Sequence, residues 1–450
     1  MAVTSERRYA GSRAPREARR EDRPRRASRP VAGVVAPLFE LLFPDGPPLR
    51  FVFWDGSALG PGNELGTVHF RSPDVLKRML WSPNELGIAR AYVVGEIEIE
   101  GDLFKALKCL HDNAASTRRI GGRALAAGAV AALRLGALGL PPKRPLEEIR
   151  LSGWRHSKRR DSAAIKHHYD VGDDFYRLVL GPTMTYSCAR FEPGETSLEA
   201  AQTSKHDMIC RKLGLDEEPG ARLLEVGCGW GSMAAHAAET YKADVVAITL
   251  SPSQASAARC RLGGAGACGA GNVDVRLQDY RDLDGETFDA ISSVGMFEHV
   301  GSKQMDQYFR KLFSLLRPEG RLLNHAISKP GGSKMRGQMF INRYVFPDGE
   351  LIDVAEVVRA MERAGFEVRD VESLREHYAL TLRSWVANLE GAWDEAVRLV
   401  GEARARVWRL YMSASANGFE DGGLAVHQVL GVRPSAGGSS GMPPTRAGWS

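Results

Sequence analysis

Hydrophobic and polar positions along the chain change their pattern near residue 166. After that point, short apolar runs alternate with stretches of mixed polarity that are long enough for helices or loops. The apolar runs lie at residues 222–227, 244–250, 273–278, 288–293, 320–327, 366–374 and 424–430. Strands that alternate with helices are typical of a parallel sheet covered on both faces. The pattern predicts an α/β domain over residues 166–432 with a doubly wound, mostly parallel seven-stranded sheet.

The residues before this domain have a different rhythm. Strand-like runs at 49–57, 66–72 and 92–102 are separated by turns, and the last alternates with a period of two. These runs predict a smaller α+β domain over residues 31–113. Residues 114–165 are rich in Ala, Gly, Arg and Pro, and we expect them to form linker helices.

Two apolar stretches are candidates for targeting or membrane segments. Residues 31–43 follow a run of arginines as a signal core would, but Pro37 and Glu40 interrupt them and no small-residue cleavage site follows. Residues 124–140 contain Arg134 and are shorter than the ~20 residues needed to span a bilayer. We expect this second stretch to be an interdomain helix, with a helix in the membrane interface as the alternative. The protein is predicted to be cytoplasmic, either soluble or peripherally associated with the inner face of the membrane.

Positive charge is concentrated at the N-terminus. Residues 1–30 hold ten arginines and four acidic residues, a net charge of +6, which leaves −1 for the rest of a chain whose formal charge is +5. A nearly neutral core disfavours nucleic acid as a partner. This arm and the Gly- and Ser-rich residues 433–450 are predicted to be disordered, and the arm either contacts anionic lipid headgroups or stays solvated.

The six cysteines are scattered and form no Cys-x-x-Cys pair or metal-like cluster. We therefore expect a reducing compartment, no structural disulfide and no metal site.

The first apolar run of the α/β domain leads into EVGCGWG, with Glu225, Gly227, Gly229 and Gly231 at alternate positions. Glycine lets a turn pass close to a ligand, because no Cβ blocks the approach. A carboxylate at the end of a strand can accept hydrogen bonds from an ammonium or hydroxyl group. The dinucleotide pattern G-x-G-x-x-G is absent, and this spacing is instead that of S-adenosylmethionine methyltransferases. A tight strand-to-helix turn without a ligand is the alternative.

Five motifs at other positions resemble one enzyme family. They are HHYDVGDDFYRLVLGPTMTYSCARF (from His167), LLEVGCGWGSM, TLSPSQ, FEHVG (from Phe297) and EHYALTLRSW (from Glu376). In this order they resemble the cyclopropane fatty acid synthases and their mycolic-acid-modifying relatives, over about residues 31–432. LGIARAYVVGE, RYVFPDGEL and RLYMSASANGFE are similar to the actinobacterial branch that makes 10-methylene and 10-methyl (tuberculostearic) fatty acids. The resemblance implies the class I S-adenosylmethionine methyltransferase fold and a lipid-binding N-terminal domain.

The resemblance also implies which residues contact S-adenosylmethionine. Besides Glu225 and the glycines, these are Tyr186, Ser187, Thr249, Leu250 and Gln254. The family's Trp-Glu pair near the adenine is replaced here by Tyr280 and Arg281, which leaves Asp279 as the expected acceptor for the adenine amino group. The second strand also ends without the acid that usually holds the ribose hydroxyls, so polar side chains after it must make that contact.

In the same family a bound bicarbonate lies beside the sulfonium and serves as the base. The resemblance implies that Cys188 and Ile327 hold it through their backbones, and Glu298, His325 and Tyr378 through their side chains. His325 lies in the apolar run RLLNHAIS, where a lone histidine is ordinarily a core residue. We expect it instead to be an anion ligand, and we expect the side chain of Cys188 to be inert packing.

The reaction sets requirements of its own on the pocket. An alkene that attacks the sulfonium methyl becomes a carbocation, so the reactants must be aligned and water must be excluded. Aromatic rings stabilise such a cation, and the candidates for this wall are Phe297, Phe340, Tyr344, Phe346 and Trp385, although each taken singly is more typical of a core residue. Residues 331–349 are expected to form a lid.

We therefore predict a C-methyltransferase that acts on the cis double bond of oleoyl-type chains of membrane phospholipids. Proton loss elsewhere than from the new methyl leaves a 10-methylene branch, which a partner reductase would saturate; proton loss from that methyl closes a cyclopropane ring, which is the alternative product. More distant alternatives are an O- or N-methyltransferase of a small metabolite and a non-catalytic lipid-binding protein. The sequence leaves open whether the protein is a monomer or a homodimer.

Overall fold

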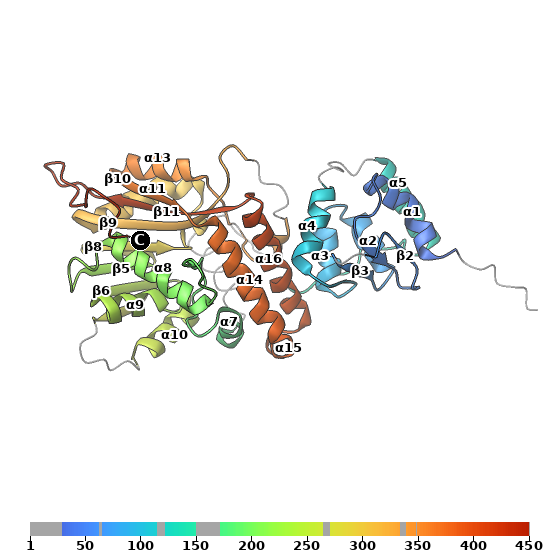
Figure 1. The fold of residues 1–450 in the computed structure, drawn as a ribbon, viewed down its shortest axis with the longest axis horizontal. Coiled ribbons are helices and arrows are strands. Elements are labelled where there is room, and N and C mark those ends of the chain that lie inside the picture. The colour runs from blue at the N-terminus through green and yellow to red at the C-terminus, as the bar shows by residue number, and fades with distance from the viewer. Residues whose placement is uncertain are drawn as a thin grey trace, which may run out of the picture.

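The computed structural model describes residues 29–62, 65–114, 122–149, 172–263, 271–333, 339–347 and 349–449. Most of the arginine-rich arm and the HHYD motif therefore lie outside the described residues. A smaller N-terminal domain and a larger sheet-containing domain lie at opposite ends of the molecule, with C-terminal helices between them (Figure 1).

The N-terminal domain packs helices onto a mixed sheet with the strand order β2-β1-β3-β4. Strands β1 and β3 are parallel, and the other pairs are antiparallel. Its elements are α1 (Val31–Leu42), β1 (Arg50–Val52), β2 (Ala58–Leu59), β3 (Thr67–Phe70), α2 (Asp74–Trp81), α3 (Glu85–Val93), β4 (Ile97–Glu100), α4 (Leu103–Ala114) and α5 (Gly122–Arg134). Phe39 of α1 packs its ring edge-on against Phe51 and Phe53, which ties the helix to the sheet.

Two expectations for this region differ from the structure. The strand predicted over 92–102 covers only β4, because α3 is capped by the Asn84 side chain, which accepts a hydrogen bond from the Leu86 N–H, and continues through Val93. Helix α5, expected to be a linker, packs on α1 and belongs to the N-terminal core. A Cβ on Gly128 would make ordinary contacts with Leu80 of α2 and Leu38 of α1, so the helix lies close to both.

The larger domain is built on a seven-stranded sheet with the order β10-β11-β9-β8-β5-β6-β7. Only β11 is antiparallel to its neighbours. The strands are β5 (Arg222–Val226), β6 (Asp244–Thr249), β7 (Val273–Leu277), β8 (Phe288–Val294), β9 (Leu316–Ser328), β10 (Glu367–Ser373) and β11 (Ala425–Val432). Each lies within or overlaps one of the seven apolar runs, and the predicted α/β fold is confirmed.

Helices cover both faces of this sheet (Figure 1). One face is covered by α8 (Leu198–Leu213), α9 (Ser232–Tyr241) and α10 (Pro252–Gly263), and the other by α11 (Met305–Leu315) and α13 (Val354–Ala364). Short 3₁₀ turns η1 (Tyr280–Asp282), η2 (Phe297–His299) and η3 (Ser302–Gln304) follow the strand ends.

The C-terminal helices join the two domains. They are α14 (Arg375–Gly391), α15 (Trp393–Val400) and α16 (Glu402–Glu420), which pack with α7 (Asp173–Leu180) and lie near α12 (Met339–Tyr344). Leu410 of α16 contacts the cores on both sides. Buried Arg406 of α16 forms ion pairs with Glu98 of β4 and Glu402.

The C-terminal residues differ from the disordered tail that we expected for 433–450. Arg321 donates a hydrogen bond to the Gly441 carbonyl, Arg446 forms an ion pair with Asp370, and Trp449 is buried against the α8–α9 side of the sheet. The indole supplies the apolar area that a Gly- and Ser-rich composition does not reveal.

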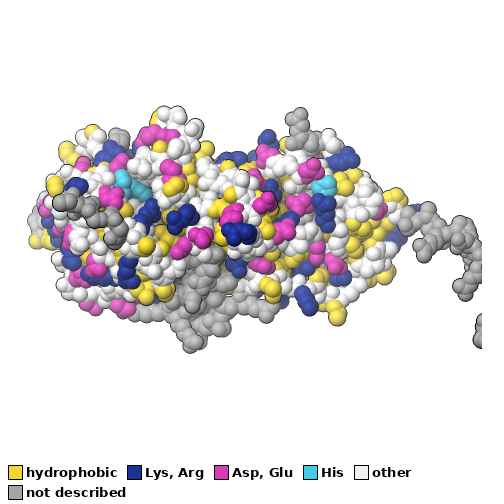
Figure 2. All heavy atoms as spheres, turned by 90° about the horizontal axis from the view of Figure 1, so that it is seen from below, with side chains coloured by type: hydrophobic (Ala, Val, Ile, Leu, Met, Phe, Trp, Pro, Cys, Tyr) yellow, Lys and Arg dark blue, Asp and Glu magenta, His cyan; other side chains and the backbone are white. Residues whose placement is uncertain are grey.

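Exposed hydrophobic side chains gather on the N-terminal domain (Figure 2). It carries ten of the thirteen large exposed hydrophobic residues in the described part of the chain. We call five of them the α5 face; they are Leu125, Val130, Leu133, Leu138 and Leu140. Within the described residues, no helix combines the length and apolar character needed to cross a bilayer.

Candidate active site

A first cavity lies at the carboxyl ends of β5, β6, β7 and β8. The turn from β5 to α9 forms its floor, and its three glycines have positive φ angles of 84°, 54° and 79°. A Cβ on Gly227 would lie 3.1 Å from the Met296 side chain, and one on Gly231 would lie 3.2 Å from Ala258. Backbone conformation favours glycine at all three positions, and limited space favours it at Gly227 and Gly231 as well.

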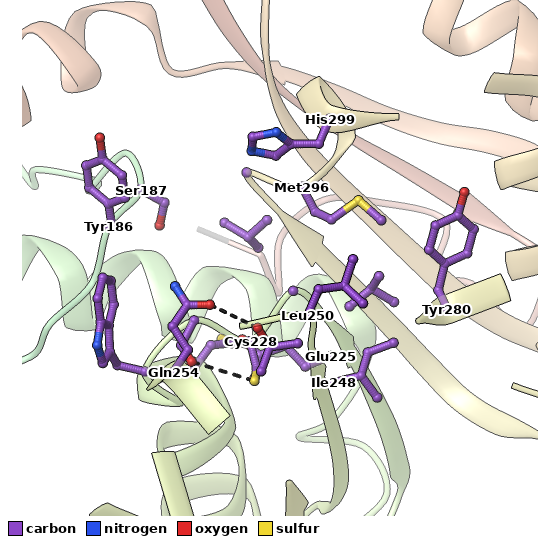
Figure 3. Close-up of a pocket in the computed structure, with 18 of the residues that line it drawn as sticks. Tyr186, Ser187, Glu225, Cys228, Ile248, Leu250, Gln254, Tyr280, Met296 and His299 are labelled. Carbon is purple, nitrogen blue, oxygen red and sulfur yellow. Dashed lines mark hydrogen bonds between the residues drawn. The ribbon is translucent and has the colours of Figure 1, made fainter. Parts of the chain in front are cut away.

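The cavity gathers ten of the eleven residues expected to contact the cofactor (Figure 3). The ten are Tyr186, Ser187, Glu225, Gly227, Gly229, Thr249, Leu250, Gln254, Asp279 and Tyr280. Gly231 does not line the cavity and instead occupies the N-cap position of α9. Residues from four loops and from the turn before α8 thus meet in one place.

Glu225 supplies an acceptor inside this cavity. Its side chain is buried, and within the described structure its Oε2 atom has no hydrogen-bond partner. Burial raises the pKa of this carboxyl to about 8, while Lys205 and the Ala234 N–H act in the opposite direction. A ligand ammonium or hydroxyl would satisfy the orphaned oxygen, as the amino-acid end of S-adenosylmethionine requires.

The polar side chains after β6 and β7 are tied to their neighbours. Thr249 donates a hydrogen bond to Gln254 Oε1 at 2.9 Å (Figure 3). Asp279 accepts two hydrogen bonds from the Arg281 guanidinium, at 2.9 and 2.6 Å. That guanidinium lies 5.6 Å from the centre of the Tyr280 ring. Arg281 therefore orients both residues expected near the adenine.

A second, larger cavity of about 1220 Å³ runs from the N-terminal domain to the end of β9. Small-molecule pockets are typically ~300–1,000 Å³, so this space suits a long ligand. All five residues expected at the anion site line it; they are Cys188, Glu298, His325, Ile327 and Tyr378. The two cavities share four lining residues, which are Tyr186, Ser187, Gly295 and His299. The two cavities are therefore adjacent at these residues.

The protonation of His325 is determined by two side chains on other elements. Lys212 of α8 donates to Gln428 Oε1 at 3.0 Å, which turns the Gln428 amide nitrogen toward His325 Nδ1 at 3.3 Å. Nδ1 therefore accepts, and the hydrogen of the neutral ring lies on Nε2. Burial, aided by Lys205 and Lys212, lowers the pKa of His325 to about 3. Nε2 has no partner within the described structure, so a buried donor is available to a ligand.

Glu298 supplies the matching acceptor. Its Oε1 accepts a hydrogen bond from the Ile327 N–H at 2.7 Å, and within the described residues its buried Oε2 has no partner. Burial raises the pKa of this carboxyl to about 7, and the Ile327 N–H lowers it in part. Because that N–H is already engaged by Glu298, an anion held by the Ile327 backbone amide would have to share this donor.

Cys188 and Tyr378 complete the group. The Cys188 thiol is fully buried, lies near the Leu374 carbonyl, and has a raised pKa because of burial, so it is a poor nucleophile. Tyr378 of α14 packs its ring 4.6 Å from that of Phe419 and 6.1 Å from that of Trp385.

The expected aromatic wall is only partly the observed one. Phe340 and Phe346, within the expected lid segment, line the second cavity, whereas Phe297, Tyr344 and Trp385 lie in the surrounding core. Rings that we did not expect there take their place; these are Tyr186, Tyr411 and Phe419.

Several lining residues of the first cavity were missed by the sequence reasoning. The clearest are Lys205 and His206, both buried on α8. A lysine on a helix is ordinarily solvated, and the pattern around 205 gives no sign that it faces inward. Only the packing of α8 against the sheet places it there.

Comparison with known proteins agrees with this geometry. The model of the mycolic acid cyclopropane synthetase family matches residues 156–429. A probable fatty acid methyltransferase of Mycobacterium tuberculosis is 41% identical over 88% of this chain and 93% of its own length. The Escherichia coli cyclopropane-fatty-acyl-phospholipid synthase is 34% identical over 82% and 88%, and the tuberculostearic acid methyltransferase UfaA1 of M. tuberculosis is 33% identical over 86% and 88%.

A solved structure, the mycolic acid cyclopropane synthase CmaA1 complexed with SAH and CTAB, superposes with a TM-score of 0.57 at 36% identity, covering 60% of this chain and 97% of that one. Its bound cofactor product agrees with S-adenosylmethionine as the cofactor here, and the α/β sheet with helices on both faces is the methyltransferase fold expected. The chain belongs to the mycolic acid cyclopropane synthetase family and is an S-adenosylmethionine-dependent methyltransferase.

Proposed function

We propose that this enzyme methylates the cis double bond of oleoyl-type acyl chains in membrane phospholipids. The observation that carries the proposal is the long second cavity, which meets the cofactor cavity at Tyr186 and Ser187. Its lining is mostly aliphatic and aromatic, with side chains from α1, α2, α3, α5 and α16. An acyl chain laid along it would bring a mid-chain double bond near the junction with the cofactor cavity.

The pocket walls supply what the chemistry demands. S-adenosylmethionine, when bound, supplies the methyl group. The rings of Tyr186, Tyr378 and Phe419 face the second cavity, and their π faces stabilise a carbocation on the alkylated chain by ~1–2 kcal/mol each when desolvated. The apolar lining keeps out the water that would otherwise trap the cation as an alcohol.

We propose that His325 and Glu298 hold a bicarbonate ion, since their orphaned atoms are a donor and an acceptor that face the same cavity. His325 Nε2–H would donate to a carbonate oxygen, and Glu298 Oε2 would accept from the O–H of the ion when it is ionised. Bound there, the ion would supply a base for the final deprotonation. Both side chains are buried, so bulk water does not reach this donor and this acceptor.

The proposed product is a 10-methylene chain that a partner reductase converts to a methyl branch. A cyclopropane ring is the second candidate, because the relatives named above include a cyclopropane synthase and a tuberculostearic acid enzyme at nearly equal identity. The two outcomes differ only in which proton leaves the cation.

We also propose that the enzyme works as a peripheral protein on an anionic membrane, with the α5 face in contact with the lipid. Residues 122–146 contain four basic side chains, Arg123, Arg134, Lys143 and Arg144, and no acidic one. Ala124, Leu125 and Gly128 of α5 line the second cavity, so the same helix borders both the exposed apolar side chains and the space proposed for the acyl chain. The +6 charge of residues 1–30 favours the same surface.

The test is product analysis. Oleoyl phospholipid vesicles are incubated with the enzyme, S-adenosylmethionine and bicarbonate, with and without a flavin- or nicotinamide-dependent reductase. Without the reductase we expect a lipid heavier by one CH₂ group, in which double-bond derivatisation or NMR locates an exomethylene group. With the reductase and its reduced cofactor, the product should gain two further hydrogens and lose that double bond. A ring without a double bond would support the second candidate, and no lipid product from any vesicle would overturn the proposal.

A further inference from the structure

We infer that Lys205 and Glu225 together bind the zwitterionic amino-acid end of the cofactor, Lys205 taking its carboxylate and Glu225 its ammonium. The inference deepens the cofactor assignment and rests on it. The inference assigns a ligand to the buried Lys205 ammonium, which was not among the site residues expected from the sequence.

The position of Lys205 is unusual for a lysine. Its side chain is 1% exposed, yet it lines the cofactor cavity together with Ser187 and Glu225. Its Nζ donates to Ser187 Oγ at 3.0 Å. An ammonium has three hydrogens, and within the described structure Ser187 takes one of them, so donors remain for a ligand. Lysines that are this buried are almost always paired with an anion.

The surrounding side chains hold this lysine in place. Buried Gln202, one turn earlier on α8, donates to the Ser187 carbonyl at 2.9 Å and fixes the turn that Lys205 contacts. Ser187 Oγ points toward the cavity (Figure 3). The cation is therefore anchored at the cavity wall, and a ligand carboxylate would not have to order it.

Glu225 provides the opposite charge in the same cavity. Its unpartnered Oε2 is an acceptor, whereas Lys205 is a donor. Burial lowers the pKa of Lys205 to about 7 and raises that of Glu225 to about 8, and the coulombic attraction between them opposes both shifts. A ligand that carries one carboxylate and one ammonium would complete both partners and favour their charged forms.

A second anion could compete for Lys205. Its charge also acts on Cys188 and His325 at the proposed bicarbonate site. Lys205 lines the first cavity, where the cofactor is expected, and does not line the second cavity. This position favours the cofactor carboxylate as its ligand. Both ligands are oxyanions, and the experiment separates them.

The test compares two ligands by isothermal titration calorimetry with the full-length protein. S-adenosylhomocysteine carries the carboxylate, and its decarboxylated analogue keeps the ammonium but lacks that group. We expect the wild type to bind the analogue about tenfold more weakly, as for loss of one charged hydrogen bond. In Lys205→Met we expect S-adenosylhomocysteine to weaken by about tenfold and the analogue by less than about twofold, so that the discrimination disappears. Lys205→Arg should retain part of it.

Lys212→Met is the matched control, because Lys212 is the other buried lysine of α8 but contacts Asp370 and does not line the cavity. It should keep the wild-type discrimination between the two ligands. Equal weakening of both ligands in Lys205→Met would overturn the inference in favour of a structural role. Unchanged S-adenosylhomocysteine binding with a raised bicarbonate requirement would overturn it in favour of the other anion. If the wild type bound neither nucleoside, the cofactor assignment itself would fall.

Discussion

His325 is held as a neutral hydrogen-bond donor by side chains from α8 and β11. Lys212 donates to the Gln428 amide oxygen, and the Gln428 amide N–H donates to Nδ1, which leaves the ring hydrogen on Nε2. A buried imidazole without such a chain would be free to take either tautomer. These two hydrogen bonds therefore determine whether His325 Nε2 can donate to an anion.

Removing this imidazole should separate binding from chemistry. We expect His325→Ala to lower turnover of lipid by at least about 100-fold, because the bicarbonate would lose the donor that holds it and a positioned base typically contributes about 10²–10⁴-fold. S-adenosylhomocysteine affinity should stay within about twofold, because His325 does not line the cofactor cavity. Calorimetry and lipid mass spectrometry on the same preparation measure both. Persistent turnover would show that His325 is a core residue.

Reversing the tautomer should be nearly as damaging as losing the ring. In Gln428→Glu the carboxylate can only accept, so Nδ1 must carry the hydrogen and Nε2 becomes a lone pair. We expect a drop in activity of at least about tenfold and a corresponding exchange of the two ring-nitrogen signals in ¹⁵N NMR. Gln307→Glu, at an exposed position of α11, is the control. An unchanged tautomer in the Glu variant would contradict the assigned hydrogen-bond chain.

Glu298 should make stability depend on pH. Its folded pKa of about 7 lies above the ordinary value of 4.5, so the folded state binds more protons in this interval. Stability from this group is then fully present below about pH 4.5 and is lost as the pH rises to about 7. Glu298→Gln retains an oxygen acceptor for the Ile327 N–H but cannot ionise.

We expect Glu298→Gln to gain melting temperature relative to the wild type at pH 8 and to lose most of that gain at pH 5. The exposed Glu362→Gln on α13 should show no such difference. An offset from the wild type that is the same at both pH values would contradict the raised pKa.

At the scale of elements, α5 contributes both to the N-terminal core and to the end of the acyl cavity. Its buried residues are Ala124, Gly128, Ala131 and Ala132, whereas Leu125 lines the cavity and Leu133 is exposed. The expectation of a linker failed because the small residues look like a flexible composition, whereas here they permit close helix packing. A segment rich in Ala and Gly can be a flexible linker or a helix interface, and the presence of another helix to pack against decides which.

Filling this contact should shorten the cavity. We expect Gly128→Leu to overpack against Leu80 and Leu38 and to lower stability by ~1–3 kcal/mol, despite a better helix propensity. Activity on long acyl chains should fall more than activity on shorter ones, because Gly128 lines the cavity. Gly33→Leu on α1 has open space around it and is the control for propensity. Equal losses for all chain lengths would argue against an acyl chain reaching α5.

The whole molecule places its apolar surface at one end and its catalytic chemistry in the other domain. The second cavity connects them, and α16 packs against both cores. Under the proposed membrane docking, a lipid would enter at the N-terminal domain while the cofactor enters at the carboxyl edge of the sheet. Neither domain alone contains the complete cavity.

Membrane contact through the α5 face is testable by placing negative charges on it. We expect Leu133→Asp combined with Leu140→Asp to reduce flotation with anionic vesicles by at least about fivefold, since each exposed leucine contributes ~1–2 kcal/mol when buried. Activity on detergent-dispersed lipid should be retained. Val371→Asp with Leu380→Asp alters exposed residues of the other domain and should leave flotation unchanged. Equal flotation of both pairs would contradict this docking face.

Several features could be predicted from the sequence because they depend on local order. The seven strands follow from apolar runs of strand length, and the glycine turn follows from residues that must adopt positive φ within five positions. The chemical types at the anion site, Glu298 and His325 among them, also came from motifs and lie together as expected. Local pattern determines the strands and the glycine turn because the atoms concerned are near neighbours in the chain. The anion-site residues are far apart in the chain, and only the family resemblance brought them together in advance.

Other features were decided only by the tertiary structure. The inward position of Lys205, the hydrogen on His325 Nε2 and the joining of α5 to α1 all depend on contacts between segments far apart in sequence. The junction of the two cavities likewise needs Ser187 and Gly295 to meet across more than one element. Burial and hydrogen-bond geometry are properties of the folded packing. The sequence pattern therefore identifies the residue type, but it does not determine the solvent exposure, hydrogen-bond partner or protonation state of that residue.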